Sequence, residues 1–383
     1  MPWEVISQMD LKKELVKDWN AKRFSITDLS QKYRVSRPTV YKWLSRYELL
    51  GDEGLKEKSR APNSCPNRTS AEILKLVVIE KLINRKRGPR KVRAQLQRKY
   101  PQLELPSISA IHNFLKKEGL VENRKLRKRV PPYTEPFSQC NAPNDVWSID
   151  YKGQFPLQNG QLCYPLTISD NFSRYLLGCK ALKGPRYDPT RSYIESVFRQ
   201  YGLPYAIRTD NGPPFAGRGI GGLSRLMIWW IQLGITPERI QKASPHQNGR
   251  HERMHGSLKR EALTPAAGNF KEQQEAIDSY RDEYNFHRPH EALNDQPPGD
   301  HYRKSNRPYV ERPHPPEYTH DFLIRSVRHN GEIKFVGRKI YISELLAGRP
   351  LGLKEIADGV WQLNFSFYAL GTLDLRKNKI LRN

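Results

Sequence analysis

The chain has 383 residues and a formal net charge of +25, from 65 Lys and Arg against 40 Asp and Glu. This length accommodates two or three domains, and so large a basic excess indicates a polyanionic partner, nucleic acid before an anionic membrane surface. No stretch approaches the roughly 18 apolar residues of a membrane span. The cysteines lack Cys-x-x-Cys spacing, so we expect neither a zinc module nor a disulfide framework, and a reducing cytoplasm fits.

The front of the chain carries most of the excess charge, with 31 basic and 15 acidic residues in positions 1–140. The segments "DLKKELVKDW", "SITDLSQKYRV" and "SRPTVYKWLSRYELLG" predict three short helices, the last with Ser36 as N-cap, Pro38 in its first turn and Gly51 at its end. This pattern predicts a helix-turn-helix unit over 1–55. An ordinary three-helix core with a solvated basic face is the alternative. The candidate DNA contacts on the last helix are Arg37, Thr39, Lys42 and Arg46.

A Pro/Ser/Asn-rich linker is expected over 56–70, followed by a second helical unit over 71–121. Three helical segments with breaks at Gly88-Pro89 and Ser107 repeat the three-helix pattern of the first unit, and this predicts a second DNA-binding module. Its candidate contacts are Arg90, Lys91 and Arg93. Residues 122–140 are basic and Pro-rich, with too few apolar residues to fold alone, and predict a second linker.

From Asn141 the sequence pattern changes: strand-like and helix-like segments follow in the order β-β-β-α-β-α-β-α. This order mixes antiparallel and parallel strands and predicts an α/β layered domain with a mixed sheet over 141–300. Residues 301–319 are expected to be a linker. Short strands separated by turns predict a small β-barrel over 320–383.

Three carboxylates stand where α/β domains place ligand groups. Asp150 lies late in the first core strand, Asp210 at the end of "YAIRTD", and Glu252 in the first turn of a helix. Taken singly, each has a structural explanation as a turn former or a partner of the helix dipole. Acids that converge in so basic a chain would repel DNA unless a cation lay between them, which favours a divalent-metal site. The competing acids are Asp145, Asp170 and Glu195.

Four segments taken in order, "WSIDYKG", "RTDNGPPF", "PHQNGRHERMHGSLKRE" and "YNFHRPHEAL", resemble the DDE transposases of bacterial insertion sequences. The resemblance covers the whole chain and implies an RNase H-like core shared with retroviral integrases. It also implies that Asp150, Asp210 and Glu252 are catalytic and bind Mg²⁺ or Mn²⁺, with two ions in the site. The chain departs from the family in a longer gap between Asp210 and Glu252, which we attribute to a loop at "AGRGIGG", and in lacking the zinc-binding front of retroviral integrases.

The segment "SPHQNGRHERMH" can then be interpreted around its carboxylate. Asn248 is expected to cap the helix that carries Glu252, while His246 and His251 could hydrogen-bond DNA or the loop and are poor ligands for hard Mg²⁺. Asn211, in the turn after Asp210, is a further supporting residue. Lys259 shares the helix face of Glu252 and resembles the basic position that contacts the DNA end in related enzymes, or is a solvated lysine.

The resemblance implies a transposase that binds the terminal inverted repeats of its own element. It would cut each end by metal-dependent hydrolysis and join the freed 3′-OH to target DNA. Two alternatives stay open: a sequence-specific regulator with an inactive core, and an RNase H-like nuclease without joining activity. The expected partners are double-stranded DNA, as element ends and target, and further copies of the chain in a dimer or higher multimer on DNA, with no membrane. The expected location is the bacterial cytoplasm, at the nucleoid.

Overall fold

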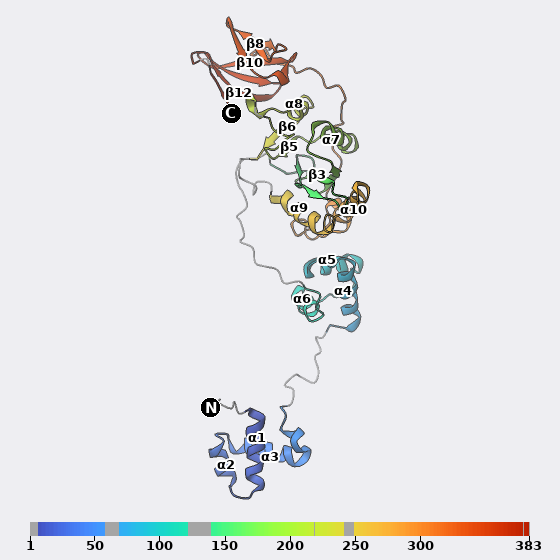
Figure 1. The fold of residues 1–383 in the computed structure, drawn as a ribbon, viewed down its shortest axis with the longest axis vertical. Coiled ribbons are helices and arrows are strands. Elements are labelled where there is room, and N and C mark those ends of the chain that lie inside the picture. Colours follow the sequence, from blue (N-terminus) through green and yellow to red (C-terminus); the bar gives the residue numbers. More distant parts are fainter. Residues whose placement is uncertain are drawn as a thin grey trace. The chain divides into compact units, whose positions relative to one another are not determined.

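A computed structural model describes residues 7–57, 69–121, 139–217, 219–240, 249–377 and 379–382 (Figure 1). The chain divides into two compact units, Met1–Thr69 and Ser70–Asn383. Within the described ranges, every helix is too short or too polar to cross a membrane.

The first unit consists of helices α1 (Gln8–Asn20), α2 (Ile26–Lys32) and α3 (Arg37–Leu50), closed by the 3₁₀ helix η1 (Gly51–Leu55). The first two helices start with capping boxes, in which a serine hydroxyl and an aspartate three residues later satisfy each other's backbone amides. Helix α3 has Ser36 as N-cap, a proline in its first turn and Gly51 after its end, as the sequence predicts. A small core holds the helices together: Leu15, Val16, Leu29, Val40, Trp43, Leu44 and Leu55.

The second unit begins with three further helices, α4 (Ala71–Ile83), α5 (Pro89–Lys99) and α6 (Ile108–Lys117). Ser70 and Ser107 cap the first and third through their side chains. The three helices share a core of six buried side chains: Val77, Val92, Leu96, Leu105, Ile111 and Leu115. Polar contacts join them to the following domain, among them Arg87 to Glu283 at 2.7 Å.

A mixed sheet lies at the centre of the second unit, as expected. Its strands are β1 (Val146–Tyr151), β2 (Phe155–Pro156), β3 (Leu162–Asp170), β4 (Leu176–Leu182), β5 (Ala206–Thr209) and β6 (Thr236–Arg239). They run in the order β2-β3-β1-β5-β6, with β4 also paired to β3. Strand β1 is antiparallel to β3 and parallel to β5, which is parallel to β6.

Helices cover both faces of this sheet. Side chains from α7 (Tyr187–Tyr201) and α8 (Arg225–Gln232) share one buried cluster with Trp147 and Ile149 of β1. Side chains from α9 (Gly249–Glu261) and α10 (Phe270–Asp282) form a separate cluster with Leu176 and Cys179 of β4. The alternation of a strand therefore turns Trp147 and Ile149 of β1 toward α7 and α8, and Ser148 and Asp150 toward the α9 face.

The C-terminal part is all β. Its strands are β7 (Leu323–Ser326), β8 (Glu332–Phe335), β9 (Arg338–Tyr341), β10 (Pro350–Ala357), β11 (Val360–Phe365), β12 (Tyr368–Asp374) and β13 (Lys379–Arg382). They form an antiparallel five-stranded sheet, β13-β12-β11-β10-β7, and a β8-β9 hairpin. The strands agree with the sequence. The expected barrel is not shown, because among the described strands β7 and β13 remain unpaired edges. Closure depends on edge-to-edge pairing, which alternation along a single strand does not encode.

The glycine-rich segment between Asp210 and Glu252 does more than lengthen a loop. It contains the 3₁₀ helix η2 (Ile220–Gly222), and the side chain of Ile220 is 5% exposed within the cluster that also holds Phe335 and Leu370. Gly221 has φ +59°, and a Cβ there would lie 3.2 Å from the carbonyl oxygen of Leu370 in β12. A glycine is required at this close approach. The insertion therefore packs the C-terminal sheet onto the central domain.

Candidate active site

Two of the three predicted acids emerge from adjacent parallel strands. Ile149 of β1 pairs with Thr209 of β5, so Asp150 and Asp210, which follow them, lie side by side at the same edge of the sheet. Asp210 also accepts a hydrogen bond at Oδ1 from the amide of Gly212, at 3.1 Å. This bond fixes the carboxylate in the turn that ends β5. The third acid, Glu252, is exposed in the first turn of α9.

The three acids interact through their charges. Burial first, then the charge of Asp210 and to a lesser extent that of Glu252, raise the pKa of Asp150 from 3.8 to about 7. Burial also raises the pKa of Asp210. Like charges act over short distances in a partly buried site, so the carboxylates of Asp210 and Glu252 lie near enough to Asp150 to raise its pKa.

Two buried histidines fasten α9 to the sheet. Nε2 of His251 is hydrogen-bonded to the Thr167 hydroxyl at 2.7 Å, and Nδ1 of the same ring is hydrogen-bonded to the Ser169 hydroxyl at 2.8 Å. His255 Nε2 also lies 2.7 Å from Thr167 Oγ1. Both imidazoles are neutral at pH 7, since burial lowers their pKa to about 3 and about 2. His251 is 1% exposed, so the sequence-based suggestion that it meets DNA is wrong.

His255 is the site residue that the sequence reasoning missed. Its Nδ1 lies 3.9 Å from Asp150 Oδ2. Within the described ranges, the cluster of ligand-type side chains whose donor atoms all lie within 4.8 Å is Asp150, His251 and His255. Asp210 and Glu252 are not drawn into it. The signal was available in the spacing, because positions 251 and 255 share a helix face with Met254 and Leu258, which are buried.

The competing acids are each committed to local structure. Asp145 accepts hydrogen bonds from the backbone amides of Asn141 and Ala142, both at 2.8 Å. Asp170 is 1% exposed and accepts from the amide of Asn144 at 2.8 Å and from the amide and hydroxyl of Ser173 at 2.7 and 2.6 Å. These bonds make both acids loop anchors.

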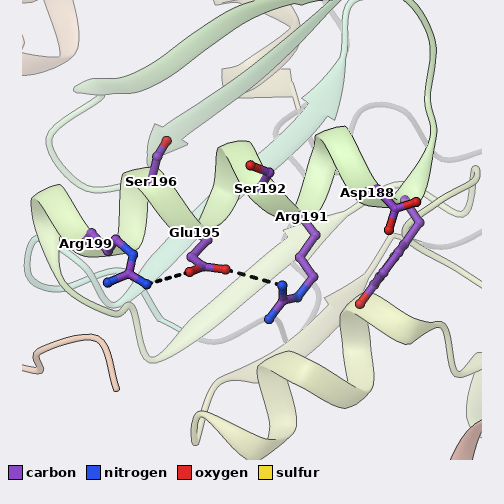
Figure 2. A pocket seen from close by; sticks show the side chains of 7 residues that line it. Asp188, Arg191, Ser192, Glu195, Ser196 and Arg199 are labelled. Carbon is purple, nitrogen blue, oxygen red and sulfur yellow. Dashed lines mark hydrogen bonds and ion pairs between the residues drawn. The ribbon is translucent and has the colours of Figure 1, made fainter. Parts of the chain in front are cut away.

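Glu195 lies elsewhere, in a shallow hollow along α7 of about 490 Å³ (Figure 2). Its carboxylate is held between the guanidinium groups of Arg191, at 3.3 Å, and Arg199, at 2.8 Å (Figure 2). The pair of arginines neutralises the acid, and pairs of this kind at i,i+4 spacing stabilise a helix surface. Glu195 is therefore a surface ion-pair residue.

The supporting residues are only partly described. Asn211 donates from Nδ2 to the carbonyl oxygen of Ile240 at 2.6 Å, which ties the turn after β5 to the end of β6. Lys259 is exposed on α9, seven residues after Glu252. His246 and Asn248 lie outside the described residues.

The predicted DNA-contacting side chains differ between the two helical units. On α3, Arg37 and Lys42 are exposed, Thr39 shares a 2.9 Å hydroxyl contact with the N-cap Ser36, and Arg46 lies 5.0 Å from the ring centre of Trp43. This basic face is open to solvent.

On α5 the predicted contacts are engaged within the second unit. Arg90 pairs with Glu291 at 2.8 Å and Asp295 at 3.0 Å, and Arg93 donates from Nε to the carbonyl oxygen of Pro106 at 3.1 Å. Burial, and then the charge of Arg288, lowers the pKa of Lys91 to about 8. Charge counted along α5 could not reveal these partners.

Without metal, the ionised Asp150 should destabilise the fold. Its folded pKa of about 7 exceeds the ordinary 3.8, so the folded state holds the proton more tightly and stability falls as pH rises through that window. Asp150→Asn should therefore raise the unfolding free energy in EDTA at pH 8, on the order of a few kcal/mol, and have little effect at pH 4. Chemical denaturation at both pH values measures this.

The matched control is Asp358→Asn, which changes an exposed turn acid far from the trio in sequence. Its unfolding free energy should change by less than about 0.5 kcal/mol at either pH. An equal gain for Asp150→Asn at pH 4 and pH 8 would show that its charge is not the cause.

Comparison with known proteins gives the domains. The integrase core domain family matches residues 141–245 and again residues 233–298, and the helix-turn-helix domain family matches residues 11–63. The first two matches contain Asp150, Asp210 and Glu252, and the third contains α3.

Several relatives belong to mobile elements. The chain is 29% identical over 226 residues to the insertion element IS407 uncharacterized 31.7 kDa protein of Burkholderia multivorans, covering 58% of this chain and 78% of that one. It is 27% identical over 218 residues to the insertion element IS476 uncharacterized 39.2 kDa protein of Xanthomonas euvesicatoria, covering 56% and 60%. It is 31% identical over 124 residues to the Gag-Pol polyprotein of baboon endogenous virus, covering 32% and 7%. This chain therefore contains a helix-turn-helix domain and an integrase core domain, and it is similar to proteins of bacterial insertion elements.

Proposed function

We propose that this protein is a transposase that cuts the ends of its own insertion element and joins the freed 3′-OH ends to target DNA. The observation that carries the proposal is the placement of Asp150 and Asp210 on paired strands, with the charge of Glu252 acting on Asp150, within segments that match the integrase core domain. Three coupled carboxylates in a chain of charge +25 need positive charge between them before a phosphodiester can approach.

The donor chemistry fits a divalent ion. Carboxylate oxygens are the ligands that Mg²⁺ and Mn²⁺ prefer. Burial and then the charge of Asp210 raise the pKa of Asp150, and a bound cation would favour the ionised carboxylate. Asp150, Asp210 and Glu252 would hold Mg²⁺ or Mn²⁺, two ions in all. Such ions, when bound, activate the attacking oxygen and stabilise the leaving oxygen of an in-line displacement.

The protein's own residues would position the reactants. Asp150 and Asp210 stand on paired strand ends, and Glu252 stands on a helix fastened to β3 by His251 and His255. Lys259, exposed on the same helix, would contact a phosphate of the element end. Water would attack the phosphorus at each end, break its bond to the 3′ oxygen and free a 3′-OH. That hydroxyl then attacks a target phosphodiester and displaces its 3′ oxygen, without a covalent protein–DNA intermediate.

Joining of a labelled element end to plasmid DNA tests this function. We expect cleavage of the end and then covalent transfer of the label to plasmid, both dependent on Mg²⁺ or Mn²⁺. Binding of the ends without cleavage would favour the alternative of a DNA-binding regulator. Cleavage without transfer would favour a nuclease of the same fold.

The exposed basic face of α3 is the proposed reader of the element ends. Arg37 and Lys42 have the freedom to reach DNA, whereas the α5 arginines are engaged within the second unit. A Lys42→Ala change in the full chain should weaken binding to the ends and reduce the steepness of its salt dependence, if the ammonium contacts a phosphate. Electrophoretic mobility shift at several salt concentrations measures both.

The matched control for Lys42→Ala is Lys354→Ala, which removes an ammonium from the C-terminal sheet that pairs with Asp321 at 2.8 Å. Its effect on end binding should be small. Equal losses for the two variants would indicate general charge attraction, and α3 would then not be the reader.

Coordinated joining also implies more than one copy of the chain. One trio attacks one phosphodiester at a time, so two ends joined to one target require at least a dimer on DNA. The charge of +25 opposes self-association of the free protein until DNA neutralises it. Sizing of the complex on paired ends should find at least two chains. We expect the complex at the bacterial nucleoid, where its DNA substrate would lie.

A further inference from the structure

The hydroxyl of Thr167 determines the protonation of both buried histidines. Thr167 Oγ1 lies 3.0 Å from the carbonyl oxygen of Asp150 and 2.7 Å from Nε2 of each imidazole, on His251 and His255. A hydroxyl carries one proton and two lone pairs, and a carbonyl oxygen can only accept. Because the Thr167 hydroxyl donates its proton to the backbone carbonyl oxygen of Asp150, Nε2 of each histidine must donate to Thr167 Oγ1.

The two histidines then differ at Nδ1. A neutral imidazole has one N–H, so both rings carry a lone pair on Nδ1. His251 Nδ1 accepts from the Ser169 hydroxyl at 2.8 Å. Among the described residues no hydrogen bond reaches Nδ1 of His255, and Oδ2 of Asp150 lies 3.9 Å from it. The positive charge of Lys152 also acts on this imidazole. His255 therefore directs an unused nitrogen lone pair at a carboxylate.

Two acceptors that face each other have no proton to share, and a cation between them would satisfy both. A separation of 3.9 Å is too long for a direct hydrogen bond. It suits a shared ion, since metal–nitrogen and metal–oxygen distances of about 2.0–2.2 Å reach across it. His255 is 6% exposed and held by the β3 hydroxyl, so its ring is oriented before any ligand arrives.

We propose that His255 Nδ1 and Asp150 Oδ2 together ligate one divalent ion, so that the site prefers a transition ion such as Mn²⁺ to Mg²⁺. Imidazole nitrogen binds first-row transition ions well, whereas Mg²⁺ is bound through oxygen. This inference rests on the proposed function only in taking Asp150 as a metal ligand. It adds a nitrogen donor to the expected carboxylates and a selectivity that carboxylates alone do not supply.

Electron paramagnetic resonance on the metal-free full chain tests the proposal. Titration with Mn²⁺ gives its affinity, competition by Mg²⁺ gives the preference, and pulsed measurement of coupling to ¹⁴N reports a nitrogen ligand directly. The wild type should bind Mn²⁺ more tightly than Mg²⁺ and show ¹⁴N coupling. His255→Gln keeps an amide N–H for Thr167 but lacks Nδ1. It should lose the coupling and at least about tenfold of the Mn²⁺ affinity, with a much smaller change for Mg²⁺.

A second variant and a control separate ligation from packing. His255→Asn places an amide near the position of Nδ1, and should lose the ¹⁴N coupling and the Mn²⁺ preference while Mg²⁺ still binds. His251→Gln removes the imidazole whose two nitrogens are both used in hydrogen bonds, and should keep the coupling even if its thermal stability falls.

The outcomes distinguish the two proposals. Tight Mn²⁺ binding without ¹⁴N coupling in the wild type, or an unchanged Mn²⁺-to-Mg²⁺ ratio in His255→Gln, would leave the histidines as packing residues and overturn this inference alone. If the wild type binds neither ion, or if Asp150→Asn binds both as the wild type does, the metal site of the proposed function fails as well.

Discussion

Asp150→Asn, Asp210→Asn and Glu252→Gln should each abolish end cleavage and joining while leaving binding of the element ends close to that of the wild type. Each change removes one anionic oxygen from the site that would hold the ions, and metal charge stabilisation is worth several kcal/mol in the transition state. Since about 1.4 kcal/mol corresponds to a factor of ten, the loss of rate should reach roughly a thousandfold or more. Cleavage and joining of labelled ends, with binding followed on the same DNA, measure the two effects separately.

Glu195→Gln is the matched control for these three variants. It makes the same chemical change to an acid of α7 that is already paired with Arg191 and Arg199 (Figure 2). Its activity should stay within a small factor of the wild type. Full activity in Glu252→Gln, or a comparable loss in Glu195→Gln, would mean that the third acid has been wrongly assigned.

Arg288→Met should lower the free energy of unfolding by about 3–5 kcal/mol, the cost of breaking a buried ion pair. The guanidinium is 6% exposed, pairs with Glu261 at the end of α9, and lies 3.3 Å from Glu283. The side chains of these two acids are 12% and 25% exposed. Removing Arg288 takes away the ion-pair partner of the largely buried Glu261, while Glu283 keeps Arg87 at 2.7 Å. Chemical denaturation of the full chain gives the loss.

A second substitution shows where that cost arises. If the penalty comes from an orphaned charge, Glu261→Gln added to Arg288→Met should recover part of the stability, because the double variant buries no unpaired carboxylate. Arg199→Ala is the exposed control. Its side chain is 49% exposed and pairs with Glu195 and Glu311, so the loss of stability should be far smaller than for Arg288→Met. Equal losses in Arg288→Met and Arg199→Ala would contradict the buried network.

Local spacing in the sequence was enough to place the secondary structure. Ser36, Pro38 and Gly51 mark the limits of α3 because caps and breakers act within one helical turn. The strand that contains Asp150 and the strand that precedes Asp210 follow from apolar runs closed by turn residues, and the motifs around them match the integrase core domain. The catalytic assignment of the trio was made at the same level and remains a prediction.

The partners of each charge were decided only by the tertiary structure. Nothing near Asp170 or Glu195 in sequence distinguishes a ligand from a loop anchor or a surface pair, until Asn144, Ser173 and the α7 arginines are placed around them.

The second helical unit illustrates the same limit. Arg90 has the sequence context of a DNA contact, yet its guanidinium meets Glu291 and Asp295, some 200 positions further along the chain.

His255 depended most on the fold, because its lone pair is defined by Thr167 of β3 and directed at Asp150 of β1. The physical reason is one of range. Caps, breakers and alternation act between neighbours in sequence, and so they can be read from it. Burial and ion pairing act between groups that meet only when the strands and helices pack, and they determine which acid is free and which imidazole nitrogen is left to bind.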